Sequence, residues 1–270
     1  MKKIIYIFIL SLFIISCEDV IDVDLETTEP RLVIDASLSW VKGTSGNEQT
    51  IILSLTAPFF NNGVPPASGA IVSVSDSENN IFNFIEEGTS GIYKNNTFIP
   101  IINGTYTLNV VYEGETYTAS ETLFAVPSID SVEQNNNGGF SGDDIEIKAF
   151  YTDPGNEENF YLFEFQNNQN VPMLEVYDDE FTDGNEIFGF FSDDEMKSGD
   201  ILSIKISGIS RRHYDFMFIL LQQTDEESGD PFETQPATVR GNCVNTTNPD
   251  NFPLGYFRVT ETDALLYTVQ

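Results

Sequence analysis

The sequence predicts an all-β protein made of two antiparallel sandwiches, the second of which carries one short helix. Three observations favour this class. Apolar and polar residues alternate along many short segments, turn-forming residues separate those segments, and one segment alone has helical spacing. Short alternating strands with regular turns are typical of sandwich domains, in which one face of each strand meets the core.

Alternation begins in the segment that we assign to the first sandwich, residues 30–126. Leu32, Ile34 and Leu38 share one face of a strand, whereas Asp35 and Ser37 share the other. The sequence Glu-Gly-Glu at 113–115 joins two such segments and predicts a hairpin. The expected strands of this domain cover residues 32–40, 51–55, 70–74, 106–112 and 116–123.

Pro127 separates this domain from a second one, which we place at 128–270. Residues 135–142 are polar and rich in glycine, so a loop is expected there. Alternation then resumes, and the expected strands cover residues 145–151, 161–165 and 202–206.

One helix is predicted over residues 210–223. Ser210 can cap its first turn, and Tyr214, Met217, Phe218 and Leu221 are spaced as on one helical face. We expect this stripe to be core and the helix to cover an edge of the second sandwich.

The N-terminus has the pattern of a lipoprotein leader over residues 1–16. Two lysines precede an apolar run from Ile4 to Ile15, and Ser16 stands before Cys17. That run of 12 residues is too short to cross a bilayer, which takes about 20 residues. Cys17 is therefore the expected lipid attachment site, and residues 17–29 form an acidic tether. The alternative is an ordinary secretory signal with an accidental cysteine.

Charge and cysteine content limit the function classes. The formal net charge is −31, and removal of Lys2 and Lys3 with the leader makes the mature chain more acidic still. Such a surface repels nucleic acid, so no nucleic-acid partner is expected. Acylation of Cys17 would leave Cys243 as the remaining cysteine, which excludes an intramolecular disulfide.

Common catalytic and metal motifs do not occur in the sequence. A single histidine, His213, cannot form a histidine-based zinc cluster, and there is no nucleophile elbow, P-loop or dinucleotide fingerprint. We interpret His213 as a surface residue at the start of the helix. A hydrolase based on two carboxylates stays open because acids are plentiful, but spacing does not single out a pair.

Two acidic turns are candidates for calcium binding, at 153–158 and 178–186. The candidate ligands are Asp153, Asp179 and Asp183, since carboxylate oxygens suit calcium. An EF-hand is excluded because aligning Gly184 with its glycine puts Phe181 at a ligand position. The alternative is that both turns are merely solvated.

Both ends of the chain resemble one family. The start, Cys17 to Leu25, is similar to the mature N-terminus of lipoproteins of the Bacteroidota that contain domain of unknown function 4249. Residues 210–216 resemble the short helix of that family. The closing motif of the family is matched by Pro236, Arg240, Gly241, Asn242, Gly255, Tyr256 and Phe257.

The resemblance implies an outer-membrane lipoprotein encoded beside a TonB-dependent receptor. It also implies an immunoglobulin-like or carboxypeptidase-regulatory-like first domain. Glu18 and Asp19 resemble a surface-export signal, and no catalytic residue is carried over. From the residues themselves, the closing motif is expected to be structural: its two glycines allow close approach of the backbone.

The sequence thus predicts a non-enzymatic lipoprotein, anchored in the outer membrane and facing outward, that assists a TonB-dependent transporter in nutrient capture or uptake. A glycan-binding sandwich is the alternative, because exposed aromatic rings can stack on sugars. No cofactor other than calcium is expected.

Overall fold

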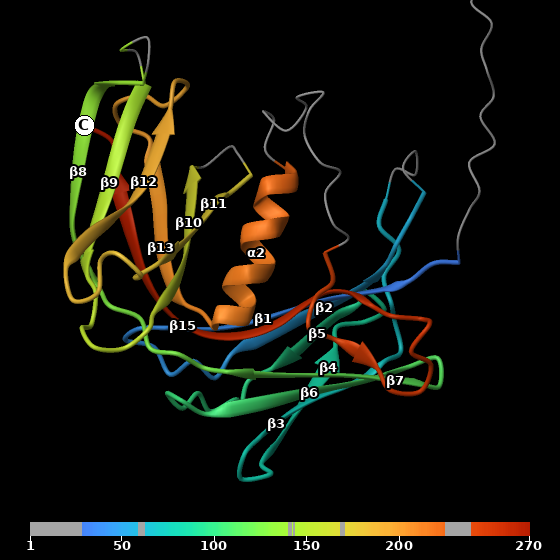
Figure 1. The fold of residues 1–270 in the computed structure, drawn as a ribbon. Coiled ribbons are helices and arrows are strands. Elements are labelled where there is room, and N and C mark those ends of the chain that lie inside the picture. The colour runs from blue at the N-terminus through green and yellow to red at the C-terminus, as the bar shows by residue number, and fades with distance from the viewer. Residues whose placement is uncertain (1–28, 59–62, 140–141, 143, 168–170, 225–238) are drawn as a thin grey trace, which may run out of the picture.

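Strand β1 (Leu32–Val41) has the alternating burial that its sequence predicts, with Leu32, Ile34 and Leu38 pointing inward. The structure is a computed structural model that describes residues 29–58, 63–139, 142, 144–167, 171–224 and 239–270 (Figure 1). The expected fold class is confirmed: the described residues form β-sandwiches with one helix.

The first sandwich is formed mainly by seven consecutive strands. β4 pairs with β5 through its end and with β3 along most of its length, so it contributes to both layers. The expected hairpin at 113–115 is present between β6 and β7. After β1 the strands are β2 (Gln49–Leu55), β3 (Ile71–Asp76), β4 (Ile81–Glu86), β5 (Ile92–Asn95), β6 (Thr105–Tyr112) and β7 (Glu115–Thr122).

The second sandwich packs a three-stranded sheet, in the order β12-β9-β8, against the strands β11-β10-β13-β15. The loop expected at 135–142 is shorter than predicted. Its first residues continue β8, whose polar side chains face outward while its backbone pairs with β9. The strands are β8 (Ile129–Gly138), β9 (Asp144–Thr152), β10 (Phe160–Asn167), β11 (Met173–Asp178), β12 (Glu186–Asp193) and β13 (Ile201–Gly208).

Residues after the helix return to the first sandwich, which differs from the expected second domain of 128–270. β14 (Val244–Asn245) pairs with β7, and the first half of β15 (Leu254–Thr268) runs parallel to β1. The second half of β15 pairs with β13. One strand therefore belongs to both sandwiches, a long-range pairing that local sequence patterns do not encode.

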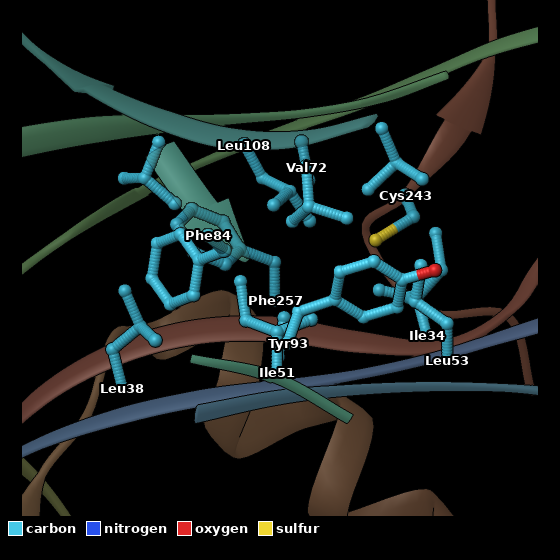
Figure 2. Packing of buried hydrophobic residues seen from close by; sticks show 14 of the residues in the cluster. Ile34, Leu38, Ile51, Leu53, Val72, Phe84, Tyr93, Leu108, Cys243 and Phe257 are labelled. Atoms are coloured by element: carbon cyan, nitrogen blue, oxygen red, sulfur yellow. The ribbon is translucent and has the colours of Figure 1, made fainter. Parts of the chain in front are cut away.

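The core of the first sandwich also contains residues from the C-terminal part of the chain. Phe257 from β15 and Cys243 lie among Ile34, Leu53 and Tyr93, which come from the N-terminal strands (Figure 2). Phe257 is completely buried there. The C-terminal residues therefore fill part of a core that begins more than two hundred residues earlier.

Helix α2 (Arg211–Thr224) stands in the angle between the two sandwiches (Figure 1). Its residue Met217 packs on Leu162 of β10 and Ile209, together with Leu174 and Val176 of β11. Among the described residues, no helix combines the length and the apolar character that a membrane crossing requires.

Candidate functional site

Three carboxylates from separate segments meet at one end of the second sandwich. Asp153 follows β9, Asp179 follows β11, and Asp183 lies in the turn before β12. One carboxylate oxygen from each of them lies within 4.8 Å of the others. Antiparallel pairing of β9 with β12 brings Thr152 opposite Glu186, and this places the two turns together. These are the three residues that the sequence analysis gave as candidate calcium ligands.

Neutral donors hold the buried Asp153 carboxylate in place. The hydroxyl of Tyr161 donates to Oδ1 at 2.6 Å, and the backbone N–H of Gly184 donates to Oδ2 at 3.0 Å. Burial raises the pKa of Tyr161, and the bond to Asp153 raises it further, so this hydroxyl stays protonated as a donor. Both oxygens of Asp153 retain a further lone pair.

Asp179 is buried as well, whereas Asp183 is exposed. The backbone N–H of Asn159 donates to Asp179 Oδ2 at 2.9 Å, and that of Asn156 donates to Asp183 Oδ1 at 2.8 Å. Burial raises the pKa of the Asp179 carboxyl, and the negative charges of its two acidic neighbours add to that rise. None of the described lysines, arginines or histidines forms an ion pair with this cluster.

The cluster fits a calcium ion by the chemistry of its donors. Calcium binds oxygen ligands from carboxylates and amide carbonyls, and buried charges are usually paired or bound to a metal. Asn159, whose backbone N–H bonds Asp179, has a buried side-chain Oδ1 atom without a hydrogen-bond partner. Asp153, Asp179 and Asp183 would hold the ion. Bound calcium would neutralise the carboxylates and link the turns.

His213 is buried, contrary to the expected surface position. Its ring lies 4.6 Å from the ring of Tyr256, centroid to centroid, and stacks on Phe216. The first turn of α2 faces β15, which explains this burial. Burial lowers the pKa of His213 to about 3, with a contribution from the charge of Arg258. The imidazole is therefore neutral near pH 7, and its Nδ1 atom has no hydrogen-bond partner.

Cys243 lies in the first core, as a small apolar residue would. Burial raises the pKa of its thiol to about 12, so the thiolate is scarce at neutral pH.

The described part of the closing motif joins the C-terminal segment to β15. The side-chain amide of Asn242 donates from Nδ2 to the carbonyl of Phe257 at 2.7 Å and accepts at Oδ1 from its N–H at 2.8 Å. The amide thus satisfies both backbone groups of one strand residue. Arg240 stacks on Phe252 at 3.8 Å, and Arg31 stacks on the same ring at 3.9 Å.

The glycines of the motif are sites of close backbone approach. A Cβ at Gly241 would lie 1.6 Å from the carbonyl oxygen of Gly255, and a Cβ at Gly255 would lie 2.1 Å from that of Ile34. The φ angle of Gly255 is also +89°. The two aromatic residues that follow point to opposite faces. Phe257 enters the first core, whereas the Tyr256 hydroxyl donates to the buried Glu121 at 3.1 Å.

Four predicted site residues lie outside the described part of the chain. They are the lipid attachment site Cys17, the export residues Glu18 and Asp19, and Pro236 of the closing motif.

A second candidate site is a groove that the sequence did not indicate. A cavity of about 750 Å³ lies between β11, β12 and α2. Phe218, expected in the core, lines this groove with 45% of its surface exposed. Helical spacing puts Phe218 on the same face as buried residues. The sequence therefore did not predict its exposure, because the groove is formed only when β11 and β12 pack near the helix.

The described fold defines a protein of two β-sandwiches that share their C-terminal strand. The chain belongs to the family described as "Domain of unknown function (DUF4249)", whose model matches residues 18–264. A search of the curated proteins finds no match.

Two solved structures match the chain. One is a two-domain fibronectin type-III segment of chicken tenascin, 12% identical, with 68% of this chain and 92% of that chain covered and a TM-score of 0.22. The other is a DUF4785 family protein from Legionella pneumophila, 11% identical, with 66% and 52% covered and a TM-score of 0.22.

Proposed function

We propose that this protein is a non-enzymatic lipoprotein of the outer membrane, anchored through Cys17 and exposed at the cell surface, that assists a TonB-dependent transporter in nutrient capture or uptake. The observation that carries the proposal is the N-terminal pattern: two lysines, a short apolar run and Ser16 before Cys17. Membership of the family supports it, because the resemblance of the two chain ends implies this cellular setting.

The arrangement of the chain supports a role in binding. An acidic stretch, residues 17–29, separates the anchor from a body that begins with β1. Fully extended, such a stretch spans roughly 40 Å, which would keep the body near the membrane and allow it to reach a neighbouring protein. Two acyl chains or more give stable attachment, since each buried CH₂ contributes about 0.8 kcal/mol.

Mass spectrometry of the mature N-terminus tests the anchor. The expected result is a chain that begins at Cys17 and carries the mass of a diacylglyceryl group. Cys17→Ala should abolish acylation and release the protein from the membrane fraction. Cys243→Ala is the matched control, because that cysteine is buried in the first core and should leave acylation unchanged. An intact leader or an unmodified Cys17 would contradict the proposal.

Affinity purification from outer membranes tests the partner. The tagged wild-type protein should recover a TonB-dependent receptor, and Cys17→Ala should recover much less because it is no longer held at the same membrane. Recovery of the anchored protein without any such receptor, over several growth conditions, would count against the accessory role but not against the anchor.

A structural calcium site is a second candidate function, favoured by the convergence of Asp153, Asp179 and Asp183 and by the buried, unpartnered side-chain oxygen of Asn159, whose backbone N–H bonds Asp179. Calcium should raise the melting temperature relative to EDTA, since a ligand at 100 times its Kd stabilises by about 2.7 kcal/mol. Asp153→Asn should remove most of this calcium-dependent increment. Asp194→Asn, a change at an exposed acid outside the cluster, should keep it. An increment of equal size in both variants would exclude the site.

A further inference from the structure

The groove between the second sandwich and α2 follows most of β11. Residues 173–177 of that strand line it, together with Phe190 of β12 and Phe218, Leu221 and Gln222 of α2. Its volume of about 750 Å³ lies within the range of protein ligand sites. In Figure 1, α2 and β11 lie next to one another, and β12 belongs to the neighbouring layer.

β11 is the last strand of its sheet. Among the described residues it pairs with β10 alone, and no strand pairs with its other edge. Half of the backbone N–H and C=O groups of an edge strand point away from its partner and can pair with an added strand. The groove therefore contains a row of backbone donors and acceptors as well as side chains.

The two faces of β11 give the groove two different walls. Leu174 and Val176 pack in one apolar cluster with Leu221 of α2. Glu175 and Tyr177 lie on the opposite face, where the Tyr177 hydroxyl accepts a bond from the N–H of Phe190 at 3.0 Å. An added strand would alternate in the same way, with one set of side chains beside the helix and the other beside β12.

The wall beside β12 carries one carboxylate. Glu175 accepts a hydrogen bond from Tyr177, and burial raises the pKa of its carboxyl group. No described lysine or arginine forms an ion pair with it. A basic side chain of a partner would supply the missing charge, and the strongly acidic chain would favour its approach.

From these contacts we infer that the groove binds an extended peptide segment of a partner protein, which adds to the free edge of β11 as a strand. Its apolar side chains lie against Leu174, Val176 and Phe218, and a basic side chain on the other face lies beside Glu175. β11 has 6 residues, so the bound segment is about 20 Å long. Backbone pairing supplies affinity, and the two walls supply specificity.

This inference rests on the proposed binding role but does not depend on the lipid anchor. It can be tested on the chain from Glu18 onwards, which contains every described strand and the helix. Failure of peptide binding would leave acylation of Cys17 untouched, and failure of acylation would leave the groove untouched.

The probe is a fluorescent peptide of alternating valine and lysine, equal in length to β11 and blocked at both ends. Two further versions carry N-methyl groups on all valines or on all lysines. In a strand, alternate residues direct their N–H groups to opposite edges, so each version blocks one edge. Strand addition predicts that one version loses binding at least about tenfold while the other binds within about twofold of the parent.

Variants of the protein locate the site. Phe218→Ser should weaken binding about tenfold because it removes an apolar wall residue. Phe181→Ser is the matched control: Phe181 is 89% exposed and does not line the groove, so its loss should leave affinity unchanged. Glu175→Gln should reduce the preference for the lysine peptide over one with glutamine in place of lysine.

Equal loss in both N-methylated versions, or equal binding by both, would overturn strand addition in favour of attraction to the acidic surface. Binding that Phe218→Ser leaves unchanged would place the peptide elsewhere. Absence of binding by the parent peptide at millimolar concentration would also overturn the inference.

Discussion

At the scale of single residues, the two glycines of the closing motif allow backbone segments to pack in direct contact. Gly255 lies against Ile34, where β15 begins its parallel pairing with β1, and Gly241 lies against Gly255. Asn242 then satisfies both backbone groups of Phe257. These contacts account for the two glycines and the asparagine of the motif without requiring a ligand.

Gly255→Ala is expected to destabilise the protein strongly. A positive φ costs an L residue about 1–3 kcal/mol, and here the new Cβ would also lie 2.1 Å from the Ile34 carbonyl oxygen. Gly199→Ala is the matched control, because Gly199 has a φ of +95° but nothing within 4 Å of its Cβ position. Urea unfolding should show a clearly larger loss for Gly255→Ala. Equal losses would mean that the backbone contact is relaxed without cost.

Residue types predicted part of the candidate calcium site. Asp153, Asp179 and Asp183 stood out because each lies in an acidic turn, and the structure brings them together. Nothing in the sequence indicated Asn159, since an asparagine in a polar turn is ordinary and only folding buries its oxygen. The prediction that His213 lies at the surface was wrong for a related reason. A residue at the start of a helix is exposed unless another element packs on it, and here Tyr256 of β15 does so.

At the scale of elements, helix α2 was predicted almost to the residue. The expected range of 210–223 compares with Arg211–Thr224, and Ser210 Oγ accepts the cap bond from the His213 N–H at 3.1 Å. Capping and helical spacing are local, so the sequence alone contains them. Strand β8 was harder to recognise, because its Asn and Gln residues face solvent and only pairing with β9 makes them a strand.

The packing of α2 on β15 predicts a pH dependence of stability that depends on His213. Its pKa is about 3 in the folded protein and 6.5 as an ordinary histidine, so below pH 6.5 the unfolded chain binds the proton more tightly. The stability that the neutral imidazole contributes is complete above pH 6.5 and is lost as the pH falls toward 3. Between pH 6.5 and 5 the loss should be about 2 kcal/mol.

Comparison of variants isolates this contribution from that of the carboxylates. Denaturant unfolding of His213→Phe should show a smaller loss than the wild type over the same pH range, because the carboxylates are common to both. Phe218→Leu changes an exposed residue of the same helix, keeps the histidine and every titratable group, and should retain the wild-type slope. If the slope of His213→Phe equals that of the wild type, the histidine titrates normally in the folded state.

At the scale of the whole molecule, β15 makes the two sandwiches one structure. Its pairing changes from β1 to β13 at Thr262, which is opposite Val41 on one side and Ser207 on the other. The Thr262 hydroxyl lies 2.8 Å from the hydroxyls of both Ser39 and Ser207. Local alternation predicted two sandwiches but not this sharing, because pairing between residues this far apart leaves no trace in a short window of sequence.

Side chains of β15 also bond to the segment that connects the two sandwiches. The N–H of Val126 donates to Glu261 Oε2 at 2.9 Å, and the N–H of Ile129 donates to Asp263 Oδ2 at 2.8 Å. The connection between the sandwiches is thus held by side chains of β15 and not by the linker alone. We therefore expect the two sandwiches to unfold in a single cooperative transition.

Leu202→Ala tests this cooperativity, because Leu202 is completely buried in the second core. Its truncation should cost about 2–5 kcal/mol. Trp40, the one tryptophan of the chain, lies at the end of β1 in the first sandwich. If the sandwiches unfold together, Trp40 fluorescence and far-UV circular dichroism should report the same lowered urea midpoint. Ile85→Ala, at an exposed position of the first sandwich, should shift neither signal by more than about 0.5 kcal/mol. A Trp40 transition that stays at the wild-type midpoint while circular dichroism separates into two steps would show that β15 can leave one sandwich without unfolding the other.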